Sequence, residues 1–480
     1  MDFFSIVMFL GLYYIRPQEW SALFFKLQPV KVAMLLAMIA MVLKYRQRSF
    51  LKDLFRTPHD WIILLYFIWL IGTAPDIRNT FSTVYSHLLF YLVTVQALSK
   101  VERIQHYLNW WTFFIVAVAA LALAGEYGFD PMNSYDLTHG PRQQGRLVLN
   151  TSIFNNPNAL GHSVVPAVVM LYFLLFWNRP VFMKIATIPV MFIPLYCIYM
   201  TLSKGAFIAG FATIVNAFTY RRPKSVQLLI FLMAFTIGFT GLKMLPRMQE
   251  MENAKGEEGI QGRVLAFQYG LTMLKTKPTG IGYNKFMKGF EQFHGFAKAP
   301  HSSYVQIGAE LGYMGLCLFI GILYCCLRTL VTVKTTNIED ERVRRILFVL
   351  LISFMLSSWM VGWSYRATFF LMVAVIAAFH RQMLAKTEVE LAEANLPLTE
   401  PELVLTVGGV ETPLSKSANP SAKPGNGARA TPKRFGQTEV EPEIVNPGIR
   451  WNRFGLMDIV LIILMTIATV QFWTYIMHHI

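Results

Sequence analysis

The chain has 480 residues, of which 54% are hydrophobic and 15% are charged, and its formal net charge is +15. The apolar residues form continuous blocks of roughly 15–22 residues, the length that crosses a hydrocarbon core. Continuous blocks exclude a membrane β-barrel, whose strands alternate apolar and polar residues. The basic residues crowd the ends of the blocks, so the charge indicates membrane topology and contact with anionic lipid rather than nucleic-acid binding.

We predict an all-α polytopic integral membrane protein with about 12–13 transmembrane helices and a larger periplasmic loop region. In chain order, the predicted spans are 3–15, 30–43, 61–75, 82–98, 107–125, 159–177, 185–202, 205–220, 226–243, 303–327, 346–364, 367–380 and 455–477. The first two are short, so they are either half-crossings or a hairpin. No basic start or small-residue cleavage site marks the N-terminus, so we expect the first helix to be retained.

Short loops that carry Lys and Arg fall on one side of the predicted bundle, and the positive-inside rule makes that side cytoplasmic. These loops lie around residues 44–56, 100–103, 179–184, 221–224 and 328–345. The N-terminus lies on the same side, and the longer loops 126–158 and 244–302 face outward. The first outer turn departs from the rule because it contains Arg16, Lys26 and Lys31.

Composition divides the chain into four regions. We expect N-terminal transmembrane helices at 1–125, a membrane core at 126–385 that includes both long loops, a disordered cytoplasmic linker at 386–453 and a last transmembrane helix at 454–480. The linker is rich in Pro, Gly and polar residues and has no periodic apolar face. It is either a plain tether or a regulatory docking segment.

The cysteines, Cys197, Cys317, Cys325 and Cys326, all lie in apolar segments and fit buried small hydrophobic residues. No Cys/His spacing indicates a metal site, and no Asp-x-Asp run occurs in the predicted outer loops. We therefore predict neither a bound metal nor a cofactor.

The outer loop 244–302 is strongly basic, with Arg247, Lys255, Arg263, Lys275, Lys277, Lys285, Lys288 and Lys298. Such a surface suits either a polyanion, for instance a lipid-linked pyrophosphate, or anionic lipid headgroups. Arg263 opens an amphipathic helix, a position where the helix dipole disfavours a cation unless an anion is bound nearby. The turn "TGIGYN" follows this helix and either cradles phosphate oxygens with its N–H groups or is an ordinary tight turn.

His301 stands at the border between this loop and the span 303–327. A helix N-terminus carries partial positive charge, which favours a bound anion and lowers the pKa of a His there, so we expect His301 to be neutral and able to accept a proton. Gly308, Gly312 and Gly315 follow on one side of the helix, a spacing that allows close helix contact. Glu310 is either a functional proton partner or a tie between two helices.

Other cations stand at predicted outer ends of spans. Lys204 lies in the break between two helices, Arg366 lies in the turn between two others, and Arg146 precedes the span that begins with "NNPNALGH". Each of these residues, taken alone, fits a side chain that extends its charge to the lipid headgroups. Together with Arg263 and His301 they reach one predicted face, which indicates an anion-binding site.

These residues carry a family resemblance. His301, Ser302, Gly312 and Gly315 fit the pattern His, then Asn, Ser or Gln, nine residues, Gly, two residues, Gly. With Arg263, "PTGIGYNKF" and "NNPNALG", the chain resembles the O-antigen ligase and Wzy polymerase superfamily over about residues 142–366. The opening "YYIRPQEW" looks like the branch of putative O-glycosylation ligases associated with exosortase A systems.

The resemblance implies a metal-independent, inverting glycosyltransferase of the bacterial inner membrane with its active site facing the periplasm. The donor would be a glycan on undecaprenyl pyrophosphate, and the acceptor a hydroxyl of lipid A-core, a protein or another glycan. The implied roles are catalysis by His301, diphosphate binding by Arg263, Lys204, Arg146 and Arg366, and support by Ser302, Glu310, Gly312 and Gly315. The family often has Arg where this chain has Lys204, and Lys lacks the bidentate fork of Arg.

Two alternatives remain at the level of the sequence. A Wzy-type polymerase differs from a ligase only in its acceptor. A flippase or exporter of lipid-linked oligosaccharides would line a path with the same charges, but its charges should reach the midplane of the bilayer and it often shows an internal repeat. Here the predicted charges gather at the outer ends and no repeat is evident, which favours the enzyme.

Overall fold

The computed structural model describes residues 2–25, 27–45, 55–220, 222–244, 258–394, 449 and 451–479. Lys26, Arg247, Lys255 and most of the predicted linker, residues 395–448, lie outside these ranges. Within them all regular secondary structure is helical, which confirms the predicted all-α fold.

The helices of the first half of the chain are α1 (Asp2–Ile15), α2 (Pro17–Trp20), α3 (Pro29–Tyr45), α5 (Pro58–Gly72), α6 (Ile77–Ala97), α7 (Val101–Glu126), α8 (Ser134–His139), α9 (Pro157–Leu171) with its π-helical continuation η1 (Tyr172–Phe176), α10 (Val181–Met200) and α11 (Lys204–Thr219). Those that follow are α12 (Lys224–Met244), α14 (Glu258–Thr276), α15 (Phe286–His294), α16 (Ser303–Thr332), α17 (Ile338–Ser357), α18 (Ala367–Ala394) and α19 (Leu456–His479).

Among the described residues, six helices are long and apolar enough to cross a membrane: α7, α9 with η1, α10, α16, α18 up to residue 390, and α19. This confirms a polytopic helical membrane protein. Shorter apolar helices include α5 and α11. The first predicted span forms α1, whose 14 residues extend only about 21 Å at 1.5 Å per residue, short of a full crossing.

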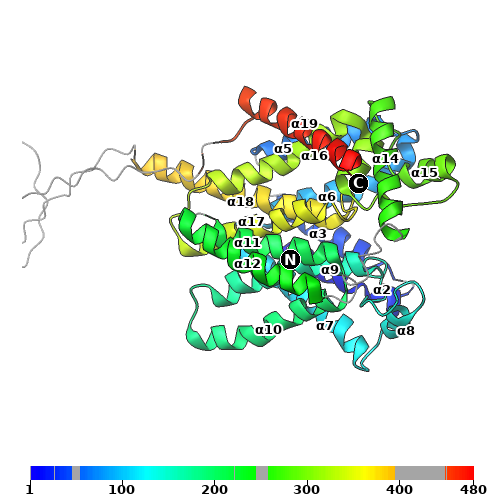
Figure 1. Cartoon of the computed structure of the whole chain (residues 1–480). Coiled ribbons are helices and arrows are strands. Elements are labelled where there is room, and N and C mark those ends of the chain that lie inside the picture. Colours follow the sequence, from blue (N-terminus) through cyan, green and yellow to red (C-terminus); the bar gives the residue numbers. More distant parts are fainter. Residues whose placement is uncertain are drawn as a thin grey trace, which may run out of the picture.

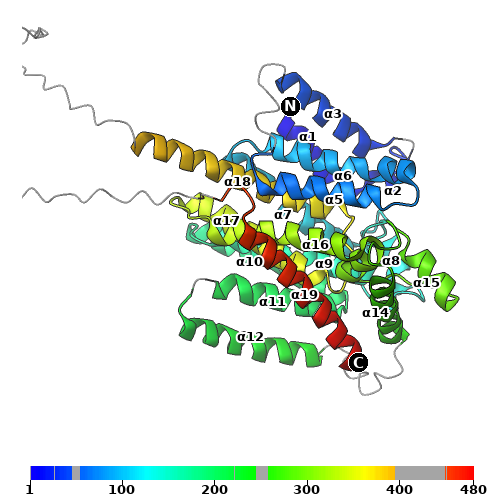
Figure 2. The same cartoon turned by 90° about the horizontal axis from the view of Figure 1, so that it is seen from above.

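Figures 1 and 2 show most of these helices side by side in one bundle, with α8 and α15 at one end and the last turns of α18 at the other. α18 is buried over nearly its whole apolar length and contacts α6, α16 and α17. A helix that is apolar on all sides belongs in the interior of such a bundle. α12 lies at the outer edge of the bundle in Figure 2, and α19 lies along its upper side in Figure 1.

α18 continues to Ala394, beyond residue 386 where the linker was predicted to begin. Polar contacts hold this extension on the bundle: Lys386 Nζ lies 2.5 Å from Asp340 Oδ2, and Arg56 Nη2 lies 2.8 Å from Glu388 Oε2. On the far side of the predicted linker, the Ile449 N–H donates to Thr387 Oγ1 at 3.1 Å. The linker prediction is therefore wrong for residues 386–394, which continue α18, and the contacts of Lys386 and Glu388 hold the beginning of this extension on the bundle.

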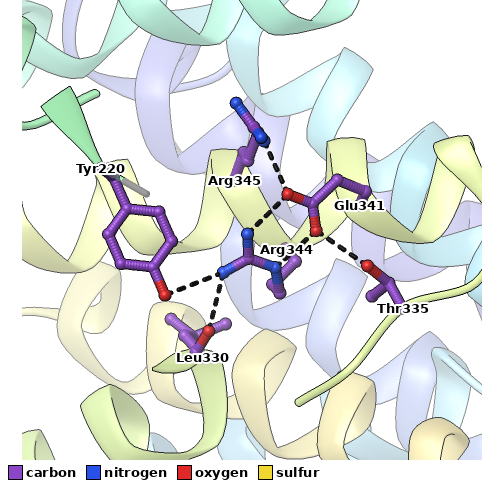
Figure 3. A network of polar contacts seen from close by, with 6 residues as sticks. All are labelled: Tyr220, Leu330, Thr335, Glu341, Arg344 and Arg345. Carbon is purple, nitrogen blue, oxygen red and sulfur yellow. Dashed lines mark hydrogen bonds and ion pairs between the residues drawn. The ribbon is translucent and has the colours of Figure 1, made fainter. Parts of the chain in front are cut away.

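A polar network closes the turn between α16 and α17 (Figure 3). The buried Arg344 donates to both carboxylate oxygens of Glu341 at 2.6 Å and to the Leu330 carbonyl at 2.9 Å. Arg345 and Thr335 also donate to Glu341, at 2.7 and 2.8 Å. Burial acts to raise the pKa of Glu341, but the hydrogen bonds and charge of Arg344 outweigh it and lower that pKa to about 2. Arg344 and Arg345, which belong to the basic loop 328–345 that indicates the topology, therefore also close this turn.

Candidate active site

Side chains from three segments meet where α10 ends and α11 begins. Arg146 donates through Nε to the Thr201 carbonyl at 3.1 Å and through Nη2 to Asn158 Oδ1 at 3.0 Å. Ser203 donates to the same Asn158 oxygen at 2.8 Å and caps α11. α11 therefore begins at Lys204, in the break that the sequence predicts. The loop that carries Arg146 is fixed beside this break.

A buried histidine, His162, lies beside Gly205, the residue that follows Lys204. His162, in the second turn of α9, is 1% exposed, and its Nδ1 lies 2.9 Å from Ser357 Oγ at the end of α17. Gly205 approaches it so closely that a Cβ at that position would lie 2.9 Å from His162 Nε2. The charge of Arg263 also acts on His162. His162 therefore lies where α9, α11 and α17 meet.

His301 lies within the range of two cations, Arg263 and Lys298. Lys298 lies against α14, where a Cβ on Gly262 would be 2.6 Å from Lys298 Nζ. Burial, followed by the charges of Arg263 and then Lys298, lowers the pKa of His301 to about 4. The imidazole is therefore neutral at pH 7. The sequence pointed to the helix dipole as the cause of this shift, whereas burial and two cations account for it here.

One predicted helix start is wrong by a few residues, whereas α16 begins where the predicted span 303–327 begins. α14 begins at Glu258, so Arg263 lies in its second turn and does not open the helix. Gly262 is inside α14, where the missing side chain makes room for Lys298. α16 begins at Ser303 because Ser302 is its N-cap and accepts from the Val305 N–H at 3.4 Å. His301 precedes this cap with a left-handed φ of 48°.

The start of α16 is fixed on the end of α17. The Ser303 N–H donates to the Ser358 carbonyl at 2.7 Å, and Ser302 Oγ donates to the same carbonyl at 3.3 Å. Ser303 Oγ in turn accepts from the Trp363 N–H at 2.9 Å. Ser302 thus holds the backbone next to His301 in place.

α16 is interrupted at Gly312, whose φ of 67° and ψ of −164° belong to a region that essentially only glycine adopts. The turn after α14 fills the interruption. Three main-chain hydrogen bonds join turn and helix: Ile281 N–H to Ala309 O (3.0 Å), Gly282 N–H to Glu310 O (2.8 Å) and Tyr313 N–H to Pro278 O (3.0 Å). The glycine-rich turn is therefore a tight turn whose N–H groups are used inside the protein, which argues against a phosphate cradle.

The three glycines of α16 that were predicted to share one side, Gly308, Gly312 and Gly315, have different surroundings. Gly308 faces Trp473 of α19 and Leu274 of α14, Gly312 forms the interruption, and Gly315 lies against the Leu311 side chain. The prediction that all three form one surface for helix contact is therefore wrong. Of these three glycines, only Gly308 meets neighbouring helices, because the interruption at Gly312 breaks the regular spacing.

Glu310 joins α16 to α15. It is 1% exposed, and its Oε1 accepts from the N–H of Phe286, the first residue of α15, at 2.9 Å. Tyr283 and Tyr365 lie close to the carboxylate. Burial, followed by the charge of Glu310, raises the pKa of Tyr283 to about 12, and the same two causes raise the pKa of Tyr365. These contacts favour a tie between two helices over a proton partner.

Arg366 is exposed and lies in the turn just before α18. It lines two cavities. One, of about 100 Å³, also has His162 in its wall, and the other, a cleft of about 800 Å³, is lined by α1, α3 and α6 with Arg16 and Lys31. Arg366 therefore stands between the His162 cavity and a large cationic cleft.

Two residues of this site, His162 and Lys298, were given no role from the sequence alone. His162 follows Asn158 by four residues, and a helix brings such a pair onto one face. That spacing, after the Asn-rich start of a span, could have indicated His162. Lys298 was noted only as one of many loop cations, and no sequence signal distinguishes it from the others.

Comparisons with known proteins are consistent with this geometry. No curated protein matches the chain. Residues 189–320 match the family described as O-antigen ligase, and this segment contains Lys204, Arg263, His301 and the interruption of α16. This segment of the chain is similar to the O-antigen ligase family, and the likeness supports an O-antigen ligase- or polymerase-type membrane enzyme.

Proposed function

We propose that this protein is a membrane glycosyltransferase that moves a glycan from undecaprenyl pyrophosphate to a hydroxyl of lipid A-core, a protein or another glycan. The site would face the periplasm from the inner membrane. The observation that carries the proposal is a neutral His301 beside the cations Arg263 and Lys298, within the segment similar to O-antigen ligases. The two cations can bind the negative charge of a diphosphate, and the neutral histidine can accept a proton from a hydroxyl.

The leaving group needs its charge stabilised. When the bond between the anomeric carbon and the phosphate oxygen breaks, the electron pair stays on the diphosphate. We assign this anion to Arg263, Lys204 and Arg146, with Lys298 added to the residues expected from sequence. Positioned cations in a site shielded from water stabilise such charge strongly and can do so without a metal.

The hydroxyl acceptor must lose its proton as it attacks the opposite face of the sugar. A pKa of about 4 makes His301 a weak base in the free protein. A diphosphate bound beside Arg263 and Lys298 would offset their charge, and the pKa of His301 would rise toward its ordinary value of about 6.5. Donor binding would thus prepare His301 to accept the proton.

The acceptor separates two related activities. A ligase attaches the glycan to lipid A-core or a protein, whereas a Wzy-type polymerase attaches it to another glycan. In both cases we assign residues 126–385 to the catalytic core. The N-terminal helices, within residues 1–125, would act beside it, because α1, α3 and α6 form much of the cleft that leads to Arg366.

Replacing Lys298 by Met is expected to change the pH dependence of transfer. One positive charge beside His301 disappears, so protonation of the imidazole becomes easier and its pKa rises above about 4. The acidic limb of kcat/KM for the donor should therefore move to higher pH. Lys288, which is exposed on α15, provides the matched control Lys288→Met. An unchanged limb in Lys298→Met would contradict this electrostatic link.

Replacing Arg263 by Ala tests the donor assignment. Loss of one charge-assisted contact to the diphosphate should raise the donor KM by about 10- to 100-fold and leave the acceptor KM nearly unchanged. Arg263→Lys should recover some of the loss because the charge remains. Lys275→Ala, which removes an exposed cation from the same helix, serves as the control. An effect confined to the acceptor KM would refute the donor role of Arg263.

A further inference from the structure

The last helix, α19, is mostly exposed but is attached at two points. Leu456, Ile463 and Leu464 are 46–77% exposed, as expected of a surface in contact with lipid. The buried Asp458 and Trp473 instead join it to neighbouring helices by side-chain hydrogen bonds. Figure 2 shows the helix crossing the bundle obliquely from the region of α17 and α18 toward α14.

The first attachment is at Asp458. Tyr324 of α16 donates to Asp458 Oδ1 at 2.6 Å, and Arg328 of the same helix forms an ion pair with it. Trp451 Nε1 donates to Asp458 Oδ2 at 3.2 Å, and the Trp451 carbonyl accepts from His380 of α18 at 2.8 Å. The beginning of α19 is therefore fixed to α16 and α18, whatever the path of residues 395–448.

The second attachment is at Trp473, which is fully buried. Its indole lies in a slot between Gly270 of α14 and Gly308 of α16, where a Cβ on either glycine would lie 3.0 or 3.1 Å from the ring. The indole Nε1 donates to the Phe267 carbonyl of α14 at 3.2 Å. One side chain thus contacts both α14 and α16.

Those two helices carry the proposed catalytic groups. Phe267 lies one turn after Arg263 on α14, and Gly308 lies less than two turns after the start of α16, which follows His301 directly. We infer that Trp473 is a positioning residue that sets the distance between Arg263 and His301. The inference rests on the proposed function, because it gives α19 a role in the same reaction. α19 acts in it as a strap across the two helices.

The test compares Trp473→Ala and Trp473→Phe in the full-length protein in membranes. Ala empties the slot, and a displacement of about 1 Å at a reacting centre can lower kcat about 100-fold. We expect a loss of about 10- to 100-fold in kcat for Ala and recovery of most of it for Phe, which refills the slot. Leu464→Ala changes an exposed residue of the same helix and should leave kcat unchanged.

A second measurement does not depend on activity. Spin labels at the exposed positions 268 on α14 and 313 on α16 report the distance between the two helices. The distance distribution should broaden in Trp473→Ala and return to its original width in Trp473→Phe. Trp473→Leu replaces the Ala variant if that variant does not fold.

The two measurements separate failure of this inference from failure of the proposed function. An unchanged distance distribution in Trp473→Ala would overturn the inference whatever the activity. A variant that has a broadened distance distribution but a wild-type kcat would overturn the inference as well. A wild type that never releases the diphosphate would refute the proposed function, and the spin labels would still show whether Trp473 fixes α14 to α16.

Discussion

Replacement of His301 is expected to lower glycan transfer by about 10²- to 10⁴-fold, the usual contribution of a general base. The protein should still fold, because Ser302 and Ser303, not His301, hold the start of α16 on α17. Asn is the better replacement, since it tolerates the left-handed φ of 48° at this position, and Ala gives a second variant without a ring nitrogen. Transfer from a lipid-linked donor by membranes with matched protein content measures the effect.

His106, an exposed histidine on α7, provides the matched control, and His106→Ala should retain full activity. Wild-type rates in both His301 variants would show that another group removes the proton. His162 would then be the next residue to change, because it lies within the range of the same Arg263 charge.

Gly312→Ala is expected to destabilise the protein more than any other substitution considered in α16. A Cβ at this position would lie 1.9 Å from the Pro278 carbonyl oxygen, and alanine strongly disfavours a φ of 67° with a ψ of −164°. Strain and loss of the hydrogen bonds to the 278–282 turn together should cost at least about 3 kcal/mol. Thermal unfolding of the purified protein in detergent would show this as a large drop in Tm or in yield.

Gly72→Ala offers a control on α5, where a Cβ has no atom within 4 Å. Alanine also has the higher helix propensity, so this variant should be as stable as the wild type or slightly more stable. Equal stability of Gly312→Ala and Gly72→Ala would mean that α16 does not need the interruption at Gly312.

The fold class could be predicted because lipid leaves few choices for a chain of long apolar blocks. The spans at 303–327 and 107–125 correspond to α16 and α7, whose apolar residues continue over many turns. The last turns of α18 could not be predicted in the same way. Their polar side chains resemble a linker in composition, and only partners such as Asp340 and Arg56 reveal that they are helical.

The candidate site could be predicted only incompletely. His301, Arg263 and Lys204 were expected together, with Arg146 and Arg366, because the predicted topology brings these residues to one face of the membrane. The interruption of α16 could not be anticipated, because it depends on an earlier turn, at residues 278–282, that supplies hydrogen bonds to Ala309 and Glu310. Likewise, Trp473 looks like any lipid-facing aromatic until Gly270 and Gly308 are seen on either side of it.

The central claim is that this protein cleaves a glycan from a polyprenyl diphosphate and passes it to a hydroxyl. The most direct measurement uses purified protein in liposomes with a lipid-linked glycan and a panel of lipid, peptide and glycan acceptors. Release of undecaprenyl pyrophosphate matched by sugar gained on one acceptor, and lost in His301→Asn, is the predicted result. Movement of the intact donor between leaflets without cleavage, for every acceptor tried, would contradict the claim and indicate a transporter.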